Sequence, residues 1–210
     1  VTGSGKTEVY LNAMEDALRS GGGVLFLVPE ISLTTQLMER IRSRFPEHEI
    51  AVLHSDIPET IRYDQWRRIR RGDLKIAVGA RSAVFAPLRN LRLIIVDEEH
   101  DGSYKQDERT RYNGRDAAIV RGQMSGAAVV LGSATPGLQT YYYVRSGKYA
   151  CLSLPNRVEN RPLPEVEVVS MSNEKDETGA IPVLSTPLVH AMSDSLAQGY
   201  QTLLFLNRRG

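Results

Sequence analysis

Short apolar runs, rich in β-branched residues, alternate along the chain with longer segments in which apolar residues recur every three or four positions. The runs predict strands, and the periodic segments predict helices that bury one face. The predicted strands are 24–28, 50–53, 75–78, 93–96, 127–131, 165–169 and 202–206. The predicted helices are 6–20, 32–45, 58–71, 115–124, 137–146 and 187–198. This alternation predicts an α/β fold, a parallel sheet with helices on both faces.

The pattern loosens after residue 150, where Pro155, Pro162 and Pro164 fall close together and a polar stretch follows. We therefore expect one lobe over residues 1–160, and a connector with the beginning of a second unit over 161–210. The chain opens inside a glycine-rich motif and closes directly after an apolar run, which indicates a fragment of a longer protein. We expect the lobe to lack a first strand that belongs in the middle of the sheet.

The amino-acid composition excludes several classes of protein. The 210 residues are 41% apolar and 24% charged, which argues against a mainly disordered chain. No apolar run reaches about 18 residues, so we expect no membrane partner. The single cysteine, Cys151, permits no intramolecular disulfide and is expected to be a buried thiol. The net charge of +1 does not favour a charge-driven nucleic-acid binder, so local motifs must support any such role.

The segment Thr2-Gly3-Ser4-Gly5-Lys6-Thr7 matches the end of the phosphate-binding motif G-x-x-x-x-G-K-[ST]. Its glycines let backbone N–H groups approach an anion, and the helix that follows adds its positive end. Lys6 is predicted to reach the β- and γ-phosphates of ATP, and the Thr7 hydroxyl is predicted to bind Mg²⁺.

The segment Asp97-Glu98-Glu99-His100 directly follows an apolar strand, at the end of the strand where parallel sheets place their ligands. Asp97 is predicted to hold Mg²⁺ through its water shell, and Glu98 to orient and deprotonate the attacking water. Ser133-Ala134-Thr135 follows another apolar strand, and its hydroxyls could bridge the acidic cluster to a second lobe. His100 is the expected link between the acidic cluster and Ser133 and Thr135.

These motifs, in this order, resemble those of superfamily-2 helicases, and the match narrows to the PriA-type DNA helicases. The segments that carry the narrower resemblance are Pro29–Thr34, Leu53–Ser55, Gly79–Pro87, Asp97–Gln106 and Phe205–Gly210. The resemblance runs from the first residue to the last. It implies a RecA-like P-loop lobe followed by the beginning of a second lobe.

The resemblance also implies a function: an ATP-driven 3′→5′ DNA helicase that acts in bacterial replication restart, in the cytoplasm at the nucleoid. Its implied partners are forked or single-stranded DNA, replication-restart proteins and single-strand-binding proteins. Segment 103–112 would be an aromatic-rich loop that senses single-stranded DNA. The implied DNA-contacting residues are Pro29, Glu30, Thr34, Arg81, Ser82, Tyr104 and Lys105.

The sequence departs from the family at Gly102 and at Asn113-Gly114, and its loop keeps only Tyr104 and Tyr112 as aromatic residues. The family's DNA-binding region, its zinc module and most of lobe 2 with its arginine finger would lie outside these residues, with zinc expected only beyond residue 210. We therefore expect the fragment alone to bind nucleotide and hydrolyse it poorly.

Two alternatives remain open. The chain could belong to another superfamily-2 motor, such as an RNA helicase or a restriction translocase, with the same ATP site and a different substrate. It could also serve as a nucleotide-dependent docking module without catalysis.

A further feature is a predicted helix on which five arginines surround Trp66. A solvated basic face with the tryptophan packed inward is favoured there over a phosphate-binding patch.

Overall fold

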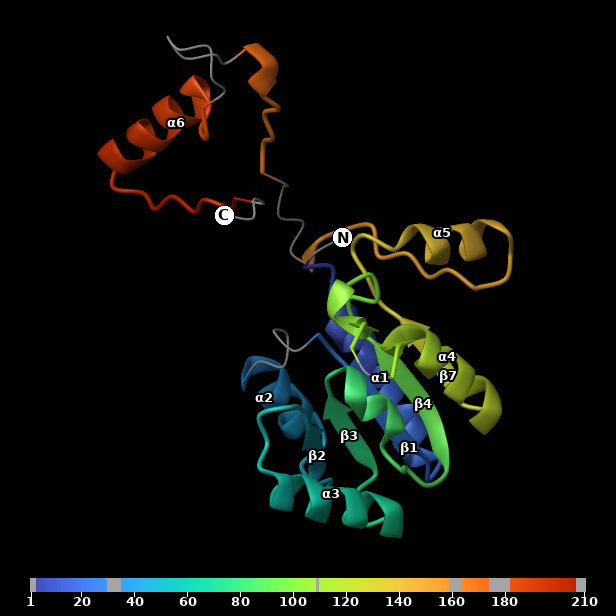
Figure 1. Cartoon of the computed structure of the whole chain (residues 1–210). Coiled ribbons are helices and arrows are strands. Elements are labelled where there is room, and N and C mark those ends of the chain that lie inside the picture. Colours follow the sequence, from blue (N-terminus) through green and yellow to red (C-terminus); the bar gives the residue numbers. More distant parts are fainter. Residues whose placement is uncertain (1–2, 30–34, 109, 159–163, 174–181, 207–210) are drawn as a thin grey trace. The chain divides into compact units, whose positions relative to one another are not determined.

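The computed structural model of the chain describes residues 3–29, 35–108, 110–158, 164–173 and 182–206 (Figure 1). The chain divides into two compact units, Val1–Arg161 and Pro162–Gly210. This division falls one residue from the predicted boundary, while the assignment of the second unit to a second motor lobe remains a prediction. Among the described residues, no helix is long and apolar enough to cross a membrane.

The first unit contains a five-stranded parallel sheet with the strand order β2-β3-β1-β4-β7 (Figure 1). The strands are β1 (Gly23–Leu27), β2 (Ile50–Leu53), β3 (Ile76–Gly79), β4 (Leu91–Val96) and β7 (Ala128–Leu131). Each strand is hydrogen-bonded to its neighbours in one uninterrupted series. The central strand of this sheet is β1, and among the described residues no strand precedes the glycine-rich loop. The absence of a first strand from the lobe stays a prediction.

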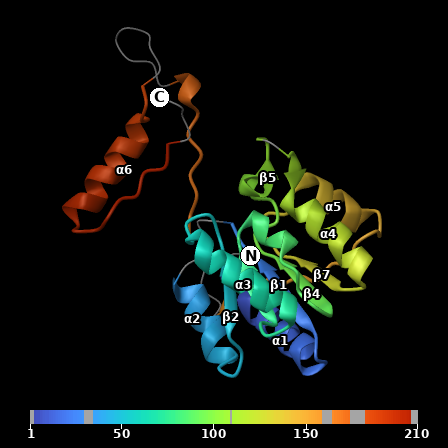
Figure 2. The same ribbon diagram turned by 60° about the horizontal axis from the view of Figure 1, so that its bottom comes forward.

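Helices cover both faces of this sheet (Figure 2). The helices of the first unit are α1 (Lys6–Arg19), α2 (Thr35–Arg44), α3 (Glu59–Arg71), α4 (Gly114–Ser125) and α5 (Leu138–Arg145). Along β1, Val24 and Phe26 pack in one core cluster with α1 and α2. Leu25 and Leu27 pack in a second cluster with residues of α3 and α4. Strands covered on both faces read as continuous apolar runs, which confirms the predicted fold class.

Two of the helices begin at a residue whose side chain caps the first turn. The Asn113 side chain accepts hydrogen bonds from the backbone N–H groups of Arg115 and Asp116 at the start of α4. In the second unit, Ser185 caps α6 (Thr186–Ala197) by accepting from the N–H of Leu188. Both helices begin within a residue of their predicted starts. The predicted helix 32–45 is seen as α2, and its first three residues lie outside the described residues.

Two predicted strands, 165–169 and 202–206, are not strands in the structure. Val168 and Phe205 are each 90% exposed, and neither segment pairs with another strand among the described residues. A strand is stable only when a neighbour pairs its backbone groups, so alternation of apolar residues alone was insufficient. Cys151 also departs from expectation, because its thiol is exposed rather than buried.

Candidate nucleotide-binding and hydrolysis site

The glycine-rich loop leads directly into α1, while Thr2 lies outside the described residues. Gly3 and Gly5 have φ angles of 76° and 86°, in the left-handed region that glycine adopts without steric cost. Within the described residues, no side chain caps the first turn of α1. Its backbone N–H groups and the positive end of the helix therefore suit an anion. A cavity of about 690 Å³ adjoins the loop and is lined by Gly3, Gly5, Lys6, Thr7, Glu8, Leu11, Arg40, Ser43, Arg44 and Val158.

One buried atom tests whether this loop fits a phosphate. The hydroxyl oxygen of Ser4 is buried, and it has no hydrogen-bond partner among the described residues. Leaving a buried hydroxyl unpaired costs about 1–3 kcal/mol. A phosphate oxygen in the loop would satisfy this hydroxyl, so the residues present fit a nucleotide phosphate.

The structure brings the loop and the acidic turn together. Lys6 Nζ lies 2.7 Å from Glu98 Oε1, although the two residues are 92 positions apart in sequence. Glu98 has a φ of 44°, a left-handed conformation that costs a non-glycine residue about 1–3 kcal/mol. The turn after β4 therefore holds backbone strain at the residue that contacts the loop lysine.

Asp97 is held by a residue that the sequence analysis missed. The Tyr10 hydroxyl donates a hydrogen bond of 2.8 Å to Asp97 Oδ1. Burial, and then the Asp97 charge, raise the pKa of the Tyr10 phenol well above its usual value, so the phenol remains a donor. Burial also raises the pKa of Asp97, while the Tyr10 hydrogen bond and Lys6 oppose this rise. Tyr10 lies four residues after Lys6, a spacing that places both on one face of α1.

His100 lies between the acidic turn and the Ser133-Ala134-Thr135 turn, as predicted. Ser133 Oγ is 2.7 Å from His100 Nδ1, and Thr135 Oγ1 is 3.2 Å from His100 Nε2. The same Nδ1 lies 3.7 Å from Glu98 Oε2. The three residues predicted to bridge the acidic cluster to a second lobe are therefore in contact with one another, and the bridge to that lobe remains a prediction.

Glu99 is a further residue that the sequence analysis did not single out. Its side chain is buried, with 2% of the residue exposed, and it accepts hydrogen bonds from Gly137 N at 2.7 Å and Thr140 Oγ1 at 2.8 Å. Arg115 Nη1 lies 3.2 Å from Glu99 Oε2. Glu99 therefore joins the acidic turn to the start of α5 and to α4. No feature of the sequence indicates that Glu99, rather than Glu98, turns inward.

The predicted DNA-contacting residues differ in their accessibility. Ser82 and Lys105 are exposed, whereas Pro29 is buried and cannot present its ring to a nucleic acid. Glu30 and Thr34 lie outside the described residues.

The prediction that Tyr104 contacts DNA does not fit the structure. It is 1% exposed, and its hydroxyl donates a 2.7 Å hydrogen bond to the Asp97 carbonyl oxygen. It ends the short helix η3 (Gly102–Tyr104), which turns the ring into the core, so Tyr104 cannot stack on a base in this conformation. Its buried hydroxyl instead finds a backbone acceptor beside the nucleotide site.

Arg81 also has a structural role. Its guanidinium donates to the carbonyl oxygens of Ser103 and Lys105 and lies over the ring of Tyr112, 5.9 Å from its centre. It thereby anchors a small antiparallel hairpin, β5 (Lys105–Gln106) and β6 (Tyr112–Asn113), that the sequence analysis did not predict.

A glycine-rich loop facing an acidic turn at the carboxyl end of a parallel sheet defines a P-loop nucleotide-binding lobe. Residues 1–143 match the DEAD/DEAH box helicase family model, and the chain belongs to this family. The family implies nucleotide binding.

Among curated proteins, the whole chain is 47% identical to replication restart protein PriA of Bacillus subtilis (strain 168) and 48% identical to that of Haemophilus influenzae. It is 42% identical over 211 residues to that of Chlamydia pneumoniae. The matches cover 26%, 28% and 28% of these relatives, so the chain spans roughly a quarter of the length of each. The chain is therefore a homologue of PriA.

Among solved structures, the C-terminal domain of the DEAD-box protein Dbp5 matches 70% of this chain and 81% of that chain, with a TM-score of 0.45 and 14% identity. The sheet order and the family match, rather than this likeness, define the fold.

Proposed function

We propose that the chain is the ATP-binding half of the motor of an ATP-dependent 3′→5′ DNA helicase or translocase that acts in bacterial replication restart. The observation that carries the proposal is the contact between Lys6 of the glycine-rich loop and Glu98 of the acidic turn. Similarity to PriA along the whole chain supports the biological setting, in the cytoplasm at the nucleoid. The partners in this proposal are forked or single-stranded DNA, replication-restart proteins and single-strand-binding proteins.

The residues of the site have distinct tasks. The loop N–H groups, the Ser4 hydroxyl and Lys6 bind the phosphates of ATP, and Lys6 leaves Glu98 to do so. Thr7, and Asp97 through the water shell of the ion, would hold Mg²⁺, and the ion would supply positive charge that neutralises the phosphoryl group being transferred. Tyr10 fixes one oxygen of Asp97 and leaves the other for this task. Glu98, released from Lys6, accepts a proton from the attacking water.

His100 transmits the state of the site. It contacts both Glu98 and the Ser133–Thr135 turn, so a shift of Glu98 away from Lys6 changes the position of a group that the turn also holds. The proposal is that Ser133 and Thr135 pass this change to a second motor lobe, of which residues 161–210 form the beginning.

The test is Lys6→Ala in the full-length protein, with DNA-stimulated ATP hydrolysis as the measurement. We expect hydrolysis to fall to background, while Lys75→Ala, which removes an exposed lysine at the opposite end of β3 from Gly79–Pro87, keeps the wild-type rate. Undiminished turnover in Lys6→Ala would overturn the assignment.

Stimulation by forked DNA, duplex DNA and RNA, compared side by side, separates this proposal from another superfamily-2 motor. The docking alternative is tested by replacing Lys6 and Glu98 together and asking whether replication partners are still captured from solution. Capture that persists together with wild-type replication restart would favour docking over catalysis.

A further inference from the structure

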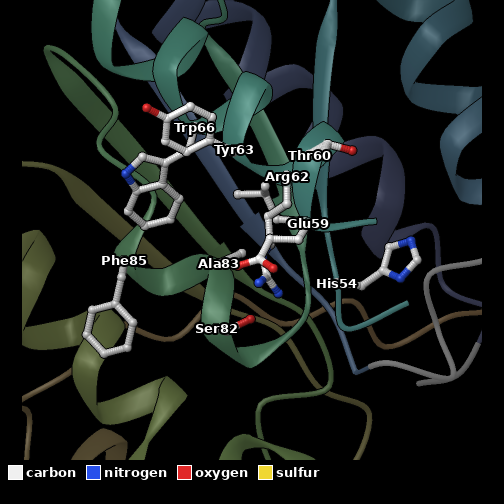
Figure 3. A pocket seen from close by; sticks show the side chains of 10 residues that line it. His54, Glu59, Thr60, Arg62, Tyr63, Trp66, Ser82, Ala83 and Phe85 are labelled. Atoms are coloured by element: carbon white, nitrogen blue, oxygen red, sulfur yellow. The ribbon is translucent and has the colours of Figure 1, made fainter. Parts of the chain in front are cut away.

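The cavity beside the glycine-rich loop has one wall that does not come from the loop or from the helices that cover the sheet. By contrast, a cavity of about 640 Å³ lies between α3 and the short helix η2 (Arg81–Phe85), and these two helices supply most of the side chains that line it (Figure 3). The cavity of about 690 Å³ at the loop is lined by the loop itself, by α1 and α2, and also by Val158, which follows α5 in sequence. Val158 therefore completes the nucleotide cavity from a segment outside the motifs.

We call residues 150–158 the return segment, because they lead from α5 back to the glycine-rich loop (Figure 1). The Val158 N–H donates a hydrogen bond of 3.0 Å to the carbonyl oxygen of Gly3. A methyl carbon of Val158 lies 3.7 Å from the position that a Cβ on Gly5 would take. Val158 thus contacts the loop at both of the glycines whose left-handed backbone shapes the phosphate site.

The hydrogen bond between Val158 and Gly3 leaves the phosphate site open. It uses a carbonyl oxygen of the loop, so it does not compete with the backbone N–H groups that suit a phosphate. It also restrains Gly3, a residue type that loses more conformational freedom on ordering than any other. A loop that is restrained before its ligand arrives loses less conformational entropy when the ligand binds. Docking of the return segment on the loop therefore favours nucleotide binding.

The return segment can leave the loop without unfolding the lobe. Residues 150–156 are exposed and form neither helix nor strand. Val158 is 58% exposed and belongs to neither core cluster of the first unit. A segment with so few buried groups opens at a small fraction of the free energy that global unfolding requires. The docked and undocked states of the return segment are therefore close enough in free energy for a ligand to shift their balance.

The return segment is also the path of the chain toward the second unit, because the first unit ends at Arg161 and the second begins at Pro162. We propose that nucleotide binding and docking of the return segment on the glycine-rich loop stabilise one another. A movement of the second unit that draws Val158 away from Gly3 then weakens nucleotide binding, by a route separate from His100. This inference rests on the proposed function, in which the second unit moves during the ATP cycle.

The first experiment follows the Val158 amide by hydrogen–deuterium exchange in the full-length protein, with and without ADP and Mg²⁺. We expect this amide to exchange about tenfold more slowly when nucleotide is bound, because its bond to Gly3 is then broken less often. The measurement needs no substitution, so it tests the proposal even if a variant folds poorly. An exchange rate that saturating ADP leaves unchanged would overturn the coupling.

The second experiment removes the hydrogen-bond donor. Val158→Pro has no N–H at this position, and we expect it to bind a fluorescent ADP analogue about tenfold more weakly than the wild type. Coupling between two events is equal in both directions, so this factor should match the slowing of exchange. Val158→Ala keeps the N–H and should lose less affinity. Ser153→Pro is the matched control, because Ser153 is exposed on the same segment and its N–H makes no backbone hydrogen bond among the described residues.

Thermal unfolding separates this coupling from a merely structural role of Val158. We expect Val158→Pro to melt near the wild-type temperature without nucleotide, and to gain less from added ADP, since bound ligand stabilises in proportion to its affinity. A variant that melts at a lower temperature without nucleotide, yet binds ADP as the wild type does, would overturn the coupling and leave the helicase proposal standing. A wild-type protein that binds no ADP at all would overturn the proposed function instead.

Discussion

The ammonium group of Lys6 and the carboxylate of Glu98 form a 2.7 Å ion pair between the glycine-rich loop and the acidic turn. Both groups are partly shielded from solvent, with side chains 18% and 33% exposed. Under the proposed mechanism, Lys6 can reach a phosphate only by leaving Glu98. Nucleotide binding and release of the catalytic base are then one event.

This relationship predicts opposite effects on binding and turnover for Glu98→Gln. Loss of the carboxylate frees Lys6, so we expect ATP affinity to stay at or above that of the wild type. Turnover should fall at least about 100-fold, because the proton acceptor is gone. Affinity for a fluorescent ATP analogue and steady-state ATPase measure the two quantities. Weaker binding than wild type, or turnover within a factor of ten of it, would contradict this account.

The second prediction concerns a side chain added at Gly132, which would disturb the same site sterically. A Cβ at this position would collide with the hydroxyl and ring of Tyr10, whose hydroxyl holds Asp97. We expect Gly132→Ala to destabilise the fold by about 1–3 kcal/mol in thermal or urea unfolding. Gly102→Ala is the control, because nothing lies within 4 Å of its Cβ position. Equal stability of the two variants would show that Tyr10 yields freely.

The third prediction concerns the effect of Asp97 on how folding stability depends on pH. Burial raises the pKa of Asp97 in the folded state, so the folded protein binds this proton more tightly than the unfolded chain. The contribution of Asp97 to folding stability is therefore fully present at low pH, where its carboxyl is protonated. It is lost as the pH rises through the pKa that Asp97 has in the folded protein. Asp97→Asn removes the buried charge and keeps an acceptor for Tyr10.

We expect Asp97→Asn to abolish hydrolysis and to melt at a higher temperature than the wild type at pH 8, without nucleotide or Mg²⁺. This difference should shrink as the pH falls into the acidic range. Asp107→Asn, at an exposed position, should melt as the wild type does at each pH. A lower melting temperature for Asp97→Asn at pH 8 would run against the burial argument.

Arg115 contacts two acids that differ in burial, and this gives the fourth prediction. The side chain of Glu99 is 1% exposed and that of Asp116 is 54% exposed. Glu99→Ala leaves Gly137 N and the Thr140 hydroxyl without their acceptor and removes the buried partner of Arg115, so we expect a loss of about 3–5 kcal/mol in unfolding free energy. Asp116→Ala should cost about 0–1 kcal/mol. Similar losses for both variants would mean that Glu99 does not hold α5 to the acidic turn.

The local pattern of the sequence predicted much of the fold. Apolar runs predicted β1 to β4 and β7. The pattern is clearest for β1 and β3, which are buried at every position because both of their faces are covered. The segments 165–169 and 202–206 are also rich in β-branched or apolar residues, yet neither is a strand. Pairing with a neighbouring strand is a long-range property that no local pattern carries.

The candidate site, like the fold, was predicted from the sequence only in part. Sequence identified the glycine-rich loop, Asp97, Glu98 and His100, because chemistry restricts which residue types can bind phosphate, hold a metal or accept a proton. It placed Tyr104 on the DNA-facing loop, yet the ring is buried against the Asp97 backbone. It also missed Tyr10 and Glu99, since a tyrosine on a helix and one acid among several have no distinctive local signature.

The sequence by itself therefore determined the order of the elements, the parallel α/β class and the reactive groups, because spacing and residue type encode these. Only the tertiary structure decided which groups meet. The contacts of Lys6 with Glu98 and Tyr10 with Asp97 span 92 and 87 positions. Such contacts depend on how the helices pack over the sheet, where each side chain's direction is set by the whole core rather than by its neighbours in sequence.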